Sequence, residues 1–164
     1  MENLGNYYNI KHGVDFRSIR YIGVISPYEY AYNGSTDYAS EIFFKAKRNQ
    51  HYTVGLSEER RLPMAYIDDI IDGTIDFLDA DNAKLTQRIY NINSCDFTVK
   101  EITDIIKMIY PSFTYESKPD IRDKISMTWP YNYNDQASRN DWNWKPKYDS
   151  LEKIINKMIR ETKI

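Results

Sequence analysis

Glycine is scarce in this sequence and widely spaced. The six glycines stand at positions 5, 13, 23, 34, 55 and 73, so no two of them are closer than eight residues. The loop that binds the pyrophosphate of a dinucleotide needs glycines two and three residues apart, and a P-loop needs two glycines five apart followed by lysine. The sequence therefore contains neither of these phosphate-binding motifs.

Cysteine and histidine are also rare. Cys95 is the only cysteine, and His12 and His51 are the only histidines. A single cysteine excludes a disulfide within the chain, and the wide spacing of these three residues excludes a zinc site of Cys/His type. We predict no metal site, and we interpret Cys95 as a buried thiol without a reactive role.

Long apolar runs and blocks of like charge are absent as well. No apolar run approaches the ~18 residues of a membrane span, and the first residues lack the basic and apolar regions of a secretory signal. Lys and Arg number 22 against 24 acidic residues, which gives a net charge of -2. We therefore predict a cytoplasmic protein with neither a membrane nor a nucleic-acid partner.

The residues that are present suffice for one folded domain. Hydrophobic residues make up 41% of the 164 residues, and a domain has roughly 150 residues on average. Apolar stretches with the pattern of strands alternate with helical patterns, which predicts an α/β fold. The predicted strands cover residues 14–26, 52–56, 62–67, 88–92 and 113–116.

Terminal signals or apolar periodicity mark five helices. Thr98 and Glu101 have the spacing of a capping box, and Gly13 stands where a helix would end. Asp149 and Glu152 repeat the capping-box spacing before the last helix. The predicted helices cover residues 1–11, 38–48, 70–78, 99–109 and 151–159, and residues 119–133 are predicted to be irregular.

Tyr7 and Lys11 have the spacing of the catalytic Tyr and Lys of short-chain dehydrogenases. That pair belongs at the beginning of a helix, whereas Lys11 precedes the expected helix end at Gly13 by two residues. The chain also contains fifteen tyrosines, so such a pair arises easily by chance. We therefore interpret this pair as a coincidence.

Two neighbouring arginines leave two interpretations open. Arg60 and Arg61 precede a strand stiffened by proline, where they would suit a phosphate or carboxylate ligand. They equally suit a solvated surface on which they balance Glu58 and Glu59.

Asp68 and Asp69 are interpreted as caps of the following helix in preference to acid or base groups. Trp129, Trp142 and Trp144 lie in polar stretches, where a tryptophan either covers a small ligand or anchors a loop. The sequence leaves these two roles of the tryptophans open.

Residues 15–26, with Arg20-Tyr21-Ile22-Gly23 at their centre, resemble the Arg-Tyr-Pro-Gly strand of the extended short-chain dehydrogenases/reductases, the NAD-dependent epimerase/dehydratase superfamily. Further segments resemble, in the same order, the short-chain type of L-threonine 3-dehydrogenase. The resemblance extends over nearly the whole chain, and its segments are residues 34–39, 61–67, 90–92, 97–98, 120–122, 129–130 and 141–144.

The resemblance implies an NAD-dependent oxidation of L-threonine to 2-amino-3-ketobutyrate by a protein that is usually a dimer. Such a protein has a Rossmann lobe and a smaller C-terminal substrate lobe, and this chain is similar only to the C-terminal part. Residues 1–26 would be the tail of the catalytic helix and the next Rossmann strand, and residues 27–164 the substrate lobe with the last α/β elements. The glycine-rich loop and the catalytic residues are expected before Met1.

The resemblance also implies roles for individual residues. The strand end at Tyr21, Ile22, Gly23 and Val24 would pass beside the nicotinamide. Thr36 and Asp37 would lie near the amino acid, and Trp129 would close the site. The family's usual Pro, Ser and Gly are replaced by Ile22, Thr128 and Asn143.

We therefore predict the substrate-lobe part of a threonine dehydrogenase, either a truncated gene product or the partner of a separately encoded Rossmann half. We expect it to be inactive and to bind NAD negligibly alone, with a homodimer or a separate Rossmann half as its partner. One alternative is a fragment of a nucleotide-sugar epimerase/dehydratase, with Arg61 on the phosphates. Another is a non-catalytic remnant or interaction module, because the strand at residues 16–25 would present an unpaired edge without preceding strands.

Overall fold

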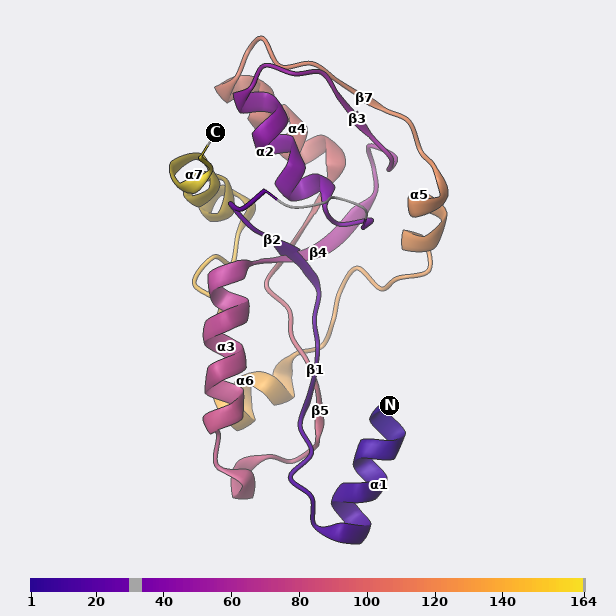
Figure 1. Ribbon diagram of the computed structural model, residues 1–164, viewed down its shortest axis with the longest axis vertical. Coiled ribbons are helices and arrows are strands. Elements are labelled where there is room, and N and C mark those ends of the chain that lie inside the picture. Colours follow the sequence, from indigo (N-terminus) through magenta and orange to yellow (C-terminus); the bar gives the residue numbers. More distant parts are fainter. Residues whose placement is uncertain (30–33, 164) are drawn as a thin grey trace.

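A computed structural model describes residues 1–29 and 34–163, and within them helices alternate with short strands (Figure 1). The predicted α/β class is confirmed. No helix of the described part is long and apolar enough to cross a membrane. In the same ranges, no three His, Cys, Asp or Glu side chains are grouped so that they would hold a metal ion.

The described strands form three small sheets. In the first, β1 (Ser18–Arg20) and β5 (Ile89–Asn91) are parallel. In the second, β4 (Arg61–Tyr66) lies between parallel β2 (Gly23–Ile25) and antiparallel β6 (Cys95–Thr98). In the third, β3 (Tyr52–Val54) and β7 (Tyr115–Ser117) are parallel.

The larger core lies at the end of the molecule that carries the C-terminus (Figure 1). It forms between the second and third sheets and α2 (Tyr38–Lys47), α4 (Val99–Ile109) and α7 (Leu151–Glu161). The apolar face of each helix has helical spacing, and Phe43, Ile102 and Ile155 are almost wholly buried on these faces. This core holds β4 in place.

A second core lies against β1 and β5. It includes residues of α3 (Ile67–Asp79) and α6 (Gln136–Trp142), and a short 3₁₀ helix (Asn82–Lys84) follows α3. Phe77, Tyr90 and Trp142 pack with their ring centroids 5.1 to 6.2 Å apart. Ile22 and Ala65 belong to the same cluster, so the link between β1 and β2 is packed into this core.

Helix α1 (Glu2–His12) ends as predicted, because Gly13 is its C-cap in the left-handed region at φ 67°. None of its residues is buried, and Leu4, Tyr7, Tyr8 and Ile10 are all exposed. The helix lies beside β1 (Figure 1) and contacts it through the Arg20–Glu2 ion pair. Among the described strands, β1 pairs with β5 alone, so its other edge carries no strand.

The predicted irregular segment at 119–133 is wrong in part. It contains α5 (Ile121–Ser126), whose N-cap Asp120 accepts a hydrogen bond from the backbone of Arg122. Strand β6 was not predicted, and the predicted strand at 14–26 is split into β1 and β2. Elements of three to six residues are too short to show a clear apolar period, and their formation depends on neighbouring segments.

Two predicted helix caps are also wrong. Helix α3 begins at Ile67, so Asp68 and Asp69 lie within its first turn. Helix α7 is capped by Ser150, whose side chain accepts from Lys153 N, whereas Asp149 pairs with the Lys153 ammonium at 2.6 Å. The capping box of Thr98 is confirmed, with reciprocal bonds to the residue three positions later.

Candidate functional site

A cavity of about 230 Å³ lies at the junction of β1 and β2. Its walls come from that junction, the segment before α2, strand β4 and the segment between α5 and α6. We call it the Thr36 cavity. Its lining residues are Tyr21, Ile22, Gly23, Thr36, Pro63, Trp129 and Tyr133.

The backbone at the cavity changes from one sheet to another. Because β1 pairs with β5 and β2 pairs with β4, Tyr21 and Ile22 lie between the two ladders. Ile22 is buried in the second core, while half of Tyr21 is exposed. The Thr74 hydroxyl donates to Ile70 O at 2.6 Å and accepts from the Tyr21 hydroxyl at 2.8 Å, which fastens the Tyr21 ring to α3.

Gly23 lets the Thr36 side chain approach the backbone closely. A Cβ at this position would lie 2.8 Å from Thr36 Cγ2 and would overlap the Met64 sulfur. The methyl group of Thr36 is therefore packed on the Gly23 backbone. Within the described residues, no hydrogen bond engages the Thr36 hydroxyl, which leaves it available to a polar ligand.

The three tryptophans have two different roles. Trp142 and Trp144 are 6% and 4% exposed and are packed in the second core, so they anchor their segments. Trp129 is 39% exposed and lines the Thr36 cavity. Tyr133, which is half-buried against the second core, lines the cavity with it.

Two residues of the predicted site lie outside the cavity. Val24 packs against the second core. Asp37 stands at the N-cap position of α2, and its Oδ2 accepts from Gly34 N at 2.7 Å. The structure thus gathers Tyr21, Ile22, Gly23, Thr36 and Trp129 around one cavity and leaves the other two residues beside it.

The Tyr7 and Lys11 pair does not line this cavity. Both lie on α1, where Tyr7 is half-exposed and packs edge-on against the rings of Tyr8 and His12. The interpretation of the pair as a coincidence stays a prediction.

Carboxylates of the chain engage both candidate arginines. Arg60 forms a two-pronged ion pair with Asp123, and Arg61 contacts Asp96 at 2.6 Å and Glu101 at 2.7 Å. The Arg60 guanidinium lowers the pKa of Asp123. These pairs favour a structural role for both arginines over the binding of a phosphate.

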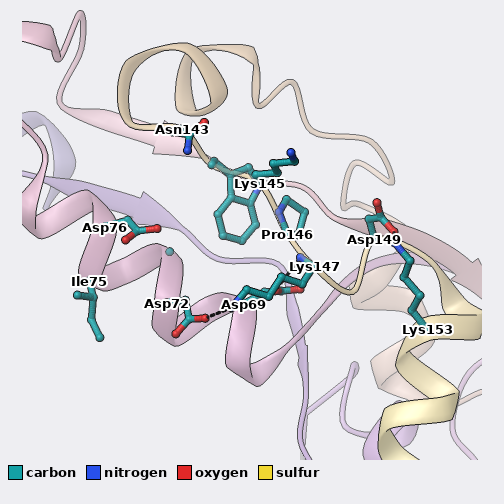
Figure 2. A pocket seen from close by; sticks show the side chains of 12 residues that line it. Asp69, Asp72, Ile75, Asp76, Asn143, Lys145, Pro146, Lys147, Asp149 and Lys153 are labelled. Atoms are coloured by element: carbon teal, nitrogen blue, oxygen red, sulfur yellow. Dashed lines mark hydrogen bonds and ion pairs between the residues drawn. The ribbon is translucent and has the colours of Figure 1, made fainter.

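A larger cavity of about 610 Å³ lies between α3 and the segment that follows α6 (Figure 2). Two ion pairs lie in its wall, because Asp72 pairs with Lys147 at 2.7 Å and Asp149 pairs with Lys153 at 2.6 Å. Asp69, which is 3% exposed, accepts from the backbone amides of residues 147 and 148. None of the predicted site residues lines this cavity.

Cys95 is half-buried on β6, and its thiol lies 3.7 Å from Met64 O. Desolvation raises the pKa of Cys95 to about 12. A thiol that stays protonated at neutral pH is a poor nucleophile. This environment supports the interpretation of Cys95 as unreactive.

No protein-family model matches the chain. The chain is 37% identical over 160 residues to the mitochondrial L-threonine 3-dehydrogenase of Bos taurus, a match that covers 96% of this chain and 42% of that protein. It is 39% identical to an uncharacterised epimerase/dehydratase of Staphylococcus aureus (strain MRSA252), covering 98% of this chain and 51% of the relative.

The chain is also similar to solved structures of L-threonine dehydrogenases. The apo form of a GalE-like L-threonine dehydrogenase from Cupriavidus necator matches 99% of this chain with a TM-score of 0.94 and 38% identity. The chain is similar to about half of that GalE-like L-threonine dehydrogenase. It covers 58% of that structure and 52% of the L-threonine dehydrogenase structure from Phytophthora infestans, where the TM-score is 0.91 and the identity 43%. The predicted family resemblance and fold are confirmed.

Two residues that line the Thr36 cavity were not among the predicted site residues. Pro63 belongs to the segment 61–67 that carried the resemblance, so that segment already contained a signal. Tyr133 lies between two resembling segments and had no such signal. Only the packing of residues 127–135 beside β1 and β2 brings Tyr133 to the cavity.

Proposed function

We propose that the Thr36 cavity holds the amino acid in an NAD-dependent L-threonine 3-dehydrogenase, of which these 164 residues form the substrate-lobe part. The reaction would be oxidation of L-threonine to 2-amino-3-ketobutyrate. One observation carries the proposal: residues from three distant segments, Tyr21, Thr36 and Trp129, line one small cavity. The homology to L-threonine dehydrogenases supports it.

The chemistry of the cavity suits a small amino acid with a hydroxyl group. The Thr36 hydroxyl would donate to or accept from a polar group of the ligand, and the rings of Tyr21 and Trp129 would cover its methyl group. Asp37 would contribute negative charge near the ammonium from the start of α2. A volume of about 230 Å³ is below the range of roughly 300 to 1,000 Å³ for drug-sized ligands, which favours a small metabolite.

The residues present do not fit a complete NAD molecule. The chain contains no closely spaced glycines for a pyrophosphate, and the Thr36 cavity is too small for a dinucleotide. NAD, which accepts hydride when bound, would therefore be held largely by other polypeptide, with Tyr21, Ile22, Gly23 and Val24 as one wall beside the nicotinamide. No catalytic residue is assigned in this chain, and we expect no threonine oxidation by it alone.

The missing contacts would come from a Rossmann half, on the same or another polypeptide, or from a second copy of the chain. The exposed apolar side chains of α1 and the open edge of β1 support a polypeptide partner. The division of the chain at residue 26 and the cytoplasmic location remain predictions.

The nucleotide-sugar alternative has less support. It requires a cation for the phosphates, and Arg61 is already paired with Asp96 and Glu101. The small volume of the Thr36 cavity also favours threonine over a nucleotide sugar.

Substitution of Thr36 tests the proposed threonine site. Thr36→Val keeps the shape of the side chain and removes the hydroxyl, so we expect the dissociation constant for L-threonine to rise about tenfold with the lost hydrogen bond. Titrations followed by NMR at the Trp129 indole N–H would measure it. L-Valine serves as a control ligand, because it lacks the hydroxyl. If the chain binds a nucleotide sugar at this cavity and does not respond to threonine, the proposal is wrong.

Calorimetry with NAD tests whether other polypeptide is needed to hold the coenzyme. We expect negligible heat when NAD is added to the 164-residue chain. Micromolar or tighter binding would contradict the view that other polypeptide holds the coenzyme.

A further inference from the structure

Two walls of the Thr36 cavity come from segments that are distant in the sequence. Pro63 belongs to β4, which is fixed in the larger core, whereas Trp129 lies in an exposed segment after the short helix α5. A six-residue helix is not stable by itself. The position of Trp129 over the cavity therefore depends on whatever holds α5 against the rest of the molecule.

An ion pair joins α5 to the segment that leads into β4. Arg60 Nε donates to Asp123 Oδ1 at 2.9 Å, and Arg60 Nη2 donates to Asp123 Oδ2 at 3.2 Å. Ser57 N donates to the same Oδ1 at 3.1 Å. The two side chains are only 22% and 12% exposed, so water competes little with this two-pronged contact.

Hydrogen bonds continue from Asp123 to the tryptophan. The Asp123 carbonyl accepts from Ser126 Oγ at 2.9 Å and from Met127 N at 3.0 Å. The Ser126 carbonyl in turn accepts from Trp129 N at 3.1 Å, and the Ser126 side chain is buried. The backbone of Trp129 is thus connected to the ion pair through one helical turn.

The other side of the cavity also contacts α5. Ser35 Oγ donates to the Arg122 carbonyl at 3.4 Å, and Ser35 directly precedes Thr36. Asp120 N donates to Gly55 O at 3.0 Å at the start of the helix. Helix α5 therefore lies between the segment of Thr36 and the segment of Arg60, with Trp129 at its C-terminal end.

We propose that the Arg60–Asp123 ion pair positions Trp129 over the Thr36 cavity, so that both residues set the affinity for the small ligand without contacting it. The identity of that ligand rests on the proposed function. The positioning itself does not, because it is a property of the chain without a ligand.

Fluorine NMR of the 164-residue chain labelled with 5-fluorotryptophan tests the positioning. Trp129→Phe identifies the Trp129 signal among the three. We expect Asp123→Asn to shift or broaden that signal, while the Trp142 and Trp144 signals stay in place. Arg60→Gln should have the same effect, and the double variant should be no worse than either single variant.

Two further variants make the result decisive. Arg60→Lys keeps the charge and loses the two-pronged contact, so it gives a milder change in a chain that folds. Asp104→Asn removes the exposed Lys100–Asp104 pair on α4 and should leave the Trp129 signal unchanged. If Trp129 is unaffected in folded Asp123→Asn, or if all three tryptophan signals change together, the positioning role is refuted.

Threonine titration separates this inference from the proposed function. We expect Asp123→Asn to raise the dissociation constant about threefold to tenfold, as for the loss of a charge-assisted contact that acts through Trp129. If the Trp129 signal changes in Asp123→Asn but the wild-type chain does not bind threonine, threonine is not the ligand and the positioning of Trp129 by the ion pair still holds. An unchanged affinity in that variant would refute the effect on binding.

Discussion

Gly23 lines the cavity and contacts Met64 of the larger core. Met64 fills the space on one side of its Cα, and Thr36 approaches from the cavity. Sequence analysis identified Gly23 only through the resemblance of its segment. Glycine suits this position because there is no space for a Cβ. This is visible only in the folded chain, where Met64 and Thr36 lie against the Gly23 backbone.

Substitution of Gly23 should therefore cost stability and distort the site. Because a Cβ would lie 2.8 Å from Thr36 Cγ2, we expect Gly23→Ala to lower the free energy of unfolding by about 1 to 3 kcal/mol, as for an overpacked core. Urea denaturation measures this change. A variant as stable as wild type would mean that the site has more room than the structure shows.

Cys95 provides a second prediction at this scale. With a pKa of about 12, the thiol is protonated at pH 8, and only the thiolate reacts with iodoacetamide. We expect the folded chain to react roughly a hundredfold more slowly than the urea-unfolded chain. Mass spectrometry of timed samples measures both rates, and equal rates would contradict the buried environment.

At the scale of elements, the long helices were predictable and the short ones were not. Helix α4 carries a capping box and an apolar face with helical spacing, and both signals are local. Helix α5 and strand β6 have six and four residues, respectively, and are held by contacts with distant segments. The error at α7 has a similar cause, since Asp149 and Ser150 both suit a cap and only the backbone conformation distinguishes them.

The cap of α7 can be tested by a matched pair of variants. Ser150→Ala removes the acceptor for Lys153 N, and we expect a loss of about 1 kcal/mol in the free energy of unfolding. Asp149→Ala removes only an exposed ion pair and should change stability by less than about 0.5 kcal/mol. Thermal or urea unfolding of both variants measures the difference. A larger loss of stability in Asp149→Ala than in Ser150→Ala would indicate that Asp149 is the cap.

At the scale of the whole molecule, ion pairs make stability depend on pH, and the Arg60–Asp123 pair among them joins distant segments. The pKa values of Asp123, Asp120 and Glu161 are lowered by side-chain bonds to Arg60, Arg122 and Lys157. A carboxyl group whose pKa is lowered in the folded state stabilises the protein at pH values above the pKa that the group has in the unfolded state. That contribution is lost as pH falls through the folded pKa. Asp69 acts in the opposite sense, because desolvation raises its pKa.

We therefore expect the urea midpoint to fall as the pH is lowered from about 5 to about 2, a range that contains the ordinary pKa of an aspartate. Asp123→Asn should show a shallower fall, because it removes one of the contributing groups. Asp104→Asn, on the exposed face of α4, is the control and should keep the wild-type slope. The same slope in Asp123→Asn and wild type would contradict the contribution of the Arg60 pair.

The sequence alone determined the alternation of helices and strands, the capping box at Thr98 and the lack of a phosphate-binding loop, because each depends on residues close together in the chain. Only the tertiary structure decided that Tyr21, Thr36 and Trp129 share a cavity, that Asp69 is a buried acceptor and that Arg60 is paired with Asp123. These contacts join segments whose approach depends on sheet pairing and on the packing of two cores, which no local pattern specifies.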